Sequence, residues 1–98
     1  MKSLDEELRR LSEQIPAVDI EVAHTSYAIS QRITELMQKR QLSKKQFADA
    51  LGRRPSEVTK WLSGQHNFTL RTIIMLADFF KEPIIKVVSD EPESEPQE

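Results

Sequence analysis

The stretch over residues 42–64, LSKKQFADALGRRPSEVTKWLSG, constrains the fold most, because it predicts two short helices joined by a tight turn. Ser43 is a favourable N-cap for the first helix, and Gln46, three residues later, completes a capping box. Gly52 ends that helix, where a left-handed backbone conformation is commonly required. Pro55 suits the first position of the second helix, because that position needs no N–H donor.

Each of these two helices is predicted to have one apolar face. The residues that form the two apolar faces are Phe47, Ala48, Leu51, Val58, Trp61 and Leu62. Ser56, Lys60 and Ser63 project from the opposite side of the second helix, with Glu57 and Thr59 on its flanks. A short helix with a small polar outer face and one lysine suits insertion into the major groove of DNA.

The stretch resembles the helix-turn-helix of the phage repressor and Cro group, often called XRE-type DNA-binding proteins. The matching positions are Leu42, Ser43, Phe47, Ala48, Leu51, Gly52, Val58 and Gly64. The segment over residues 61–73, WLSGQHNFTLRTI, resembles a bacterial subgroup related to antitoxin-type regulators. The resemblance covers residues 20–80 and implies an all-α, repressor-like bundle of five helices or so.

The resemblance also implies how residues of this chain would contact DNA. Family members often carry glutamine at the position of Lys44 and a polar base-reading residue at that of Pro55. Because Pro55 has no hydrogen-bonding side chain, base reading falls on Ser56, Glu57, Thr59 and Lys60. Glu57 has a second interpretation, as a cap of its own helix.

Phosphate contacts are expected on both sides of this helix. The basic residues expected to anchor phosphates are Lys44, Lys45, Arg53 and Arg54. The resemblance assigns a phosphate clamp to the loop that follows, at Gln65, His66, Asn67 and Thr69. A simpler interpretation is that this loop only carries Phe68 into the core.

The charge distribution agrees with a DNA-binding surface, although the whole chain has a net charge of −2. Residues 39–71 contain eight basic and two acidic side chains, whereas the segments before and after them are neutral or acidic. Since the Debye length is about 8 Å at physiological salt, the local positive charge governs contact with phosphates.

Composition excludes several other function classes. The chain has no cysteine and only two glycines, so it has no disulfide, no cysteine-based zinc site and no glycine-rich phosphate loop. It shows no nucleophile elbow, metal-ligand spacing or catalytic acid pair, and we expect neither an enzyme nor a bound metal or cofactor. Without a long apolar run or a signal peptide, we expect no membrane association and a bacterial cytoplasmic location at the nucleoid.

The segment over residues 1–19 is interpreted as an N-terminal helix and linker. Leu4, Leu8, Leu11 and Ile15 form a single apolar seam. A helix of about three turns is too short to be stable alone, so it must pack on its own domain, on a second subunit or on a partner protein. Pro16 ends this pattern.

The segment over residues 20–82 is interpreted as the DNA-binding domain. Asp19 is predicted to cap a long first helix that runs from Ile20 to Arg40. Thr69 is predicted to cap a last helix that starts at Leu70. The buried stripe expected on that last helix is Leu70, Ile73, Ile74, Ala77 and Phe80, with Leu76 partly buried.

Residues 83–89 are interpreted as a short β-strand that mediates dimerisation through Ile84, Ile85, Val87 and Val88. Because one strand cannot satisfy its own backbone, we expect antiparallel pairing with the same strand of a second copy. Two alternatives are an extended segment that lies on the core and a strand donated to a partner. Residues 90–98 form an acidic tail that is expected to be disordered.

Two functions follow from these interpretations. The first is a homodimeric, sequence-specific double-stranded DNA-binding regulator, a repressor that reads the major groove with residues 55–63. The alternative is an antitoxin that neutralises a protein toxin and regulates its own operon through the same DNA-binding domain.

Overall fold

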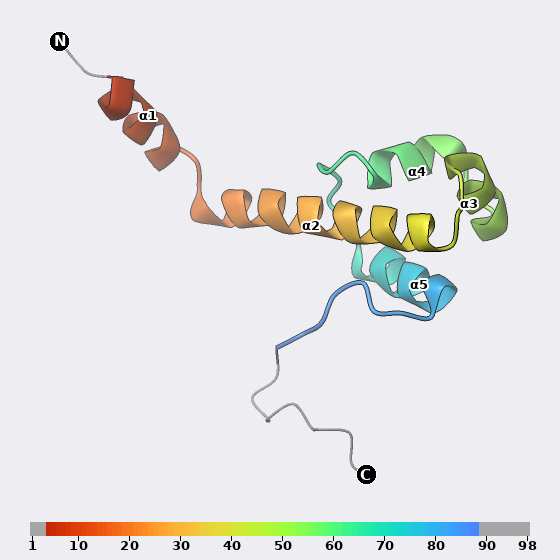
Figure 1. The fold of residues 1–98 in the computed structure, drawn as a ribbon. Helices are drawn as coiled ribbons and strands as arrows, with labels where there is room; N and C mark the ends of the chain where they lie inside the picture. Colours follow the sequence, from red (N-terminus) through yellow and green to blue (C-terminus); the bar gives the residue numbers. More distant parts are fainter. Residues whose placement is uncertain (1–3, 89–98) are drawn as a thin grey trace.

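The computed structural model describes residues 4–88, which form five helices and no strand. The helices are α1 (Leu4–Glu13), α2 (Ala17–Lys39), α3 (Lys44–Leu51), α4 (Pro55–Trp61) and α5 (Leu70–Phe80). In Figure 1, α3, α4 and α5 gather around the C-terminal half of α2, and α1 leads away from them. The predicted all-α class is therefore confirmed, with four helices in the bundle and α1 outside it. No helix within residues 4–88 has the length and apolar character to cross a membrane.

Local hydrogen bonds fix the ends of the short helices. The Ser43 hydroxyl accepts from the Gln46 backbone N–H at 3.0 Å, and the Gln46 side chain accepts from the Ser43 N–H at 2.8 Å. Gly52 ends α3 with φ +68°, a conformation that glycine adopts without strain. The Thr69 hydroxyl accepts from the Thr72 N–H at 3.1 Å at the start of α5. The capping predictions at Ser43, Gly52 and Thr69 are therefore confirmed.

The core lies where α2, α3, α4 and α5 meet. Its largest fully buried apolar side chains are Phe47, Phe80, Ile33, Leu36, Leu76 and Val58. Phe47 of α3 is central among them, since its ring centroid lies 6.1 Å from that of Trp61, 5.6 Å from Phe79 and 5.3 Å from Phe80. One aromatic side chain of α3 thus connects α4 to α5.

Two predicted helix features are wrong. The long helix α2 begins at Ala17 with Pro16 as its N-cap, so Asp19 lies inside its first turn and caps nothing. On α5, Leu70 and Ile74 are 67% and 58% exposed, whereas Leu76 is fully buried. The helix turns its Ile73–Leu76–Phe80 side to the core, a face with spacings of three and four residues.

The predicted C-terminal strand is also not supported. Residues 85–88 have no regular secondary structure, and no described segment pairs with them. Ile84 is buried in the core, while Val87 and Val88 are 86% and 95% exposed. The alternative of an extended segment on the core therefore holds at Ile84. The described part of the chain excludes residues 1–3, residue 89 and the predicted acidic tail over residues 90–98.

An ion-pair cluster fastens the segment after α5 to α2. Glu82 accepts from Lys39 Nζ at 2.9 Å and from Arg32 Nη2 at 3.4 Å, and Arg32 Nε donates to the Pro83 carbonyl at 3.0 Å. Arg40 donates to the Phe80 carbonyl, the last residue of α5. These contacts hold the C-terminal end of α5 in place and direct Ile84 into the core.

This cluster predicts a pH dependence of stability. The hydrogen bond from Lys39 lowers the pKa of Glu82 below its ordinary 4.5. A carboxyl group whose pKa is lowered by folding stabilises the fold above its unfolded pKa, and this contribution is lost as the pH falls through the folded pKa. Glu82→Gln is therefore expected to lower the melting temperature relative to wild type at pH 7. This difference is expected to disappear in acid, where the wild-type carboxyl is protonated. Melting curves from pH 7 to pH 3 check this; a difference from wild type that stayed constant over that range would contradict it.

Candidate nucleic-acid interface

Helix α4 packs against α3 with one side and leaves the other in solvent. Val58 and Trp61 are buried, and Trp61 contacts Phe47 of α3 through its ring. Ser56, Thr59 and Lys60 are exposed. Because the apolar side is anchored at two positions, the polar side is held rigidly outward, as direct reading of base edges requires.

Lys44 and α4 share one surface. Lys44 Nζ donates to Thr59 Oγ1 at 3.3 Å, and the Thr59 hydroxyl donates to the Pro55 carbonyl at 3.1 Å. The first residue of α3 therefore lies beside the middle of α4. A predicted phosphate anchor and a predicted base-reading residue are thus in direct contact, although they are fifteen residues apart in the sequence.

Glu57 has both carboxylate oxygens engaged. Its Oε1 accepts from the Arg54 backbone N–H at 3.3 Å, and its Oε2 accepts from Arg53 Nη1 at 3.3 Å. This arrangement favours the interpretation of Glu57 as a cap of α4. A contact between Glu57 and a base would compete with these two bonds.

The four predicted phosphate-anchoring cations differ in their surroundings. Lys45 pairs with Asp49 at 3.1 Å, and Arg53 pairs with Glu57 and also donates to Met75 Sδ at 3.3 Å. Within residues 4–88, Lys44 and Arg54 form no ion pair. The first two cations must exchange a carboxylate for a phosphate on binding, whereas the other two need not.

The loop after α4 is attached to α2 by a buried serine that the sequence analysis missed. Ser30 Oγ donates to the Trp61 carbonyl at 2.6 Å and accepts from the Gly64 N–H at 3.1 Å. Gly64 itself has φ +84°, and a Cβ there would lie 3.1 Å from Tyr27 Cδ1. The only sequence signal was a serine between Ile29 and Ile33, on the apolar face of α2.

Ser30→Ala is expected to destabilise the protein by about 1–3 kcal/mol, because it leaves the buried Trp61 carbonyl and the part-buried Gly64 N–H without their partner. Urea unfolding measures this change. Ser63→Ala is a matched control on the exposed side of the same loop, and about 0.5 kcal/mol or less is expected there. Equal effects of the two substitutions would contradict the role of Ser30.

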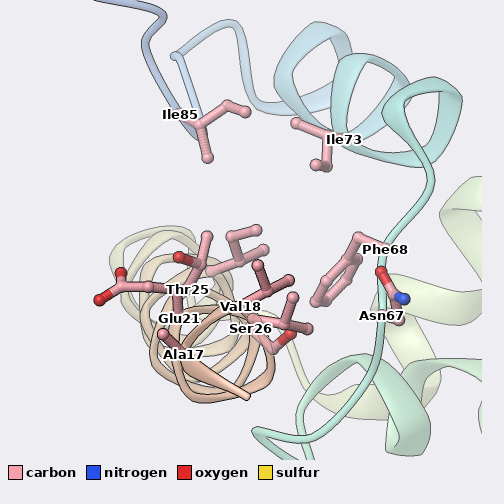
Figure 2. Close-up of a pocket in the computed structure, with 11 residues that line it drawn as sticks. Ala17, Val18, Glu21, Thr25, Ser26, Asn67, Phe68, Ile73 and Ile85 are labelled. Atoms are coloured by element: carbon pink, nitrogen blue, oxygen red, sulfur yellow. The ribbon is translucent and has the colours of Figure 1, made fainter.

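The four residues of the predicted phosphate clamp have different surroundings. Gln65 is exposed next to the end of α4, and its N–H donates to Ser63 Oγ at 3.1 Å. The His66 ring packs edge-on against Phe68 with centroids 4.7 Å apart. Asn67 lines an apolar groove beside Phe68, as Figure 2 shows. The Thr69 hydroxyl is occupied in capping α5.

Phe68 is half-buried against the core, as the simpler interpretation of this loop predicts. The clamp therefore stays a prediction, with Gln65 the member whose side chain is both exposed and nearest in sequence to α4.

Comparison with known proteins agrees with this geometry. The family model described as helix-turn-helix (HTH_3) matches residues 33–87, which include the end of α2, all of α3, α4 and α5, and the extended segment. The match covers more than half of the chain, so the protein belongs to this XRE-type helix-turn-helix family. Searches of curated proteins and of solved structures found no match.

Proposed function

We propose that the protein is a sequence-specific, double-stranded DNA-binding transcriptional regulator that acts as a dimeric repressor. The observation that carries this proposal is the exposed polar side of α4, with Lys44 of α3 bonded to it at 3.3 Å. Binding alone is the proposed activity, without catalysis or a cofactor. Such a protein would act in the bacterial cytoplasm, on the nucleoid.

Within this proposal, Ser56, Thr59 and Lys60 contact base edges in the major groove. Lysine at such a position pairs best with the O6 and N7 acceptors of guanine. Lys44 and Arg54 hold the flanking phosphates, and Lys45 and Arg53 join them once they release their carboxylates. Glu57 keeps the start of α4 in order.

A homodimer would place two copies of α4 in successive turns of the major groove, about 34 Å apart along the DNA. Two-fold symmetry of the protein then matches a palindromic operator. Occupation of such a site blocks polymerase without any effector pocket.

Two alanine substitutions separate base reading from phosphate anchoring. Lys60→Ala is expected to relax specificity at one operator position, with a loss of discrimination of about 1–3 kcal/mol. Lys44→Ala is expected to weaken binding to operator and random DNA alike, because it removes a phosphate contact. Selection from random DNA followed by titration checks both. Parallel losses on operator and random DNA for both variants would defeat the base-reading role of Lys60.

A second candidate function is that of an antitoxin, and the exposed apolar seam of α1 is the observation that favours it. A protein toxin that covered this seam would be neutralised while α4 regulated the shared operon. Expression of a neighbouring small gene would then arrest growth. Relief of this arrest by the wild-type protein, but not by its Leu8→Glu variant, would support the antitoxin function.

A further inference from the structure

An apolar groove runs beside the N-terminal half of α2. It has a volume of roughly 490 Å³, and Val18, Val22 and Ile29 of α2 form one side of it. The other side is formed by Phe68, Ile73 and Ile85. Figure 2 shows open space between α2 and the side chains of Ile73 and Ile85. In Figure 1, α1 points away from this part of the bundle. The residues that line the groove start at Ala17, after the end of α1.

Helix α1 has an apolar surface that is exposed to solvent. Its apolar side chains lie on one seam and are exposed, with exposed fractions of 72% for Leu4, 55% for Leu8 and 57% for Leu11. A ten-residue helix is not stable in water on its own, so its helical state depends on covering this seam. The chain therefore contains an amphipathic helix without a groove and an apolar groove without a helix.

We propose that α1 of a second copy of this chain occupies the groove, and that the two copies exchange their α1 helices reciprocally. Such an exchange covers the seam of α1 and the groove of both copies. Because it is reciprocal, it gives a closed dimer with a two-fold axis. This inference rests on the proposed function, because two half-sites call for a dimer, and it names the surface that makes the dimer.

The connection between the helices favours a second copy over the chain's own groove. Helix α1 already ends at Glu13, and Pro16, the N-cap of α2, has an extended backbone with φ −58° and ψ 140°. The chain therefore changes direction between the two helices. Ile15 precedes a proline and is therefore disfavoured in a helical conformation. The groove begins at Ala17, directly after this linker, so α1 departs from the end of its own groove and reaches outward.

The apolar area is sufficient for a weak to moderate dimer. The seam of α1 and the exposed groove residues Val18, Val22 and Ile85 would together bury on the order of 1,000 Å² over the two copies, the lower end of specific interfaces. Val87 and Val88 follow Ile85 after Lys86, and their exposed side chains can extend the same surface.

Disulfide trapping tests the arrangement directly, because the chain has no cysteine of its own. The single variants Leu8→Cys and Val22→Cys are prepared with affinity tags of different length, so that their mixed product can be recognised by its size. They are mixed without DNA and oxidised mildly. We expect the mixed disulfide as the main product. The double variant is expected to give a cross-linked dimer. An intramolecular bond in a monomeric double variant would overturn the proposal in favour of the chain's own groove. A dominant Leu8–Leu8 disulfide would overturn it in favour of two paired seams.

Sedimentation without DNA provides the second test. Leu8→Glu and Val22→Glu are each expected to raise the dissociation constant of the dimer at least 100-fold. Ile74→Glu is the matched control, since Ile74 is an equally exposed apolar residue outside the groove, and no change is expected. A wild type that stays monomeric at 100 μM or so would overturn the proposal.

The failure of this inference is distinguishable from failure of the proposed function. A monomeric protein that still recognises a half-site would overturn the exchange of α1 and the dimeric state, but not sequence-specific DNA binding. The wild type could instead form a dimer that Leu8→Glu and Val22→Glu dissociate, yet bind no DNA. That result would support the exchange and refute the proposed function as a DNA-binding regulator.

Discussion

Raising the concentration of monovalent salt from about 50 to about 200 mM is expected to lower the affinity for the operator on the order of 10⁴-fold. Each phosphate neutralised by a lysine or arginine releases condensed counterions. The free energy gained from this release becomes smaller as the salt concentration rises. In the proposed dimer, eight such contacts are expected from Lys44, Lys45, Arg53 and Arg54, so the logarithmic slope should be near −7 or so. Fluorescence anisotropy at a series of salt concentrations measures it.

The size of this slope depends on two existing ion pairs. Lys45–Asp49 and Arg53–Glu57 are surface pairs at 3.1 and 3.3 Å, and pairs of this kind contribute only about 0–1 kcal/mol. A phosphate on DNA is therefore expected to displace the carboxylate from each cation. If the pairs stayed closed, about four contacts would remain and the slope would be near −4 or so. A slope shallower than about −2 would contradict phosphate anchoring by α3 and the turn.

Phe47→Ala is expected to have the largest effect on stability, with a loss of about 3–5 kcal/mol. The fully buried ring contacts Trp61 of α4 and both Phe79 and Phe80 of α5, so its removal leaves a cavity where three helices meet. Because domains have only about 5–15 kcal/mol in total, the variant should be largely unfolded at 37 °C or close to it. DNA binding should be lost with the fold.

Urea unfolding followed by circular dichroism measures this loss. Leu70→Ala is the control, since Leu70 is a large apolar side chain on the exposed side of α5 and should change stability by about 0.5 kcal/mol or less. A Phe47→Ala protein that unfolded cooperatively within about 1 kcal/mol of wild type would contradict the central place of this ring.

The features that could be predicted from the sequence are those set by nearby residues. The Ser43–Gln46 capping box, the left-handed Gly52 and the Thr69 cap all depend on contacts within three or four positions. The exposed side of α4 followed in the same way, because Val58 and Trp61 fix which face of the helix is buried.

The features that could not be predicted depend on packing between distant segments. The periodicity of α5 allows Leu70 and Ile74 or Leu76 to face inward, and only the position of α2 and α3 decides between them. Ile84 reads as part of a strand, but the Glu82 ion pairs direct it into the core. The bond between Ser30 and Gly64 spans 34 residues, and a serine on the apolar face of α2 does not by itself identify such a distant partner.

Methylation interference tests most directly whether the polar face of α4 lies in the major groove. The N7 atom of guanine faces the major groove and the N3 atom of adenine faces the minor groove, so methyl groups at the two atoms report separately on each groove. We predict that guanine N7 methylation blocks binding in two patches about one helical turn apart, and that Lys60→Ala removes the interference at one guanine of each patch. Interference from adenine N3 alone, or a pattern that Lys60→Ala leaves unchanged, would contradict the account.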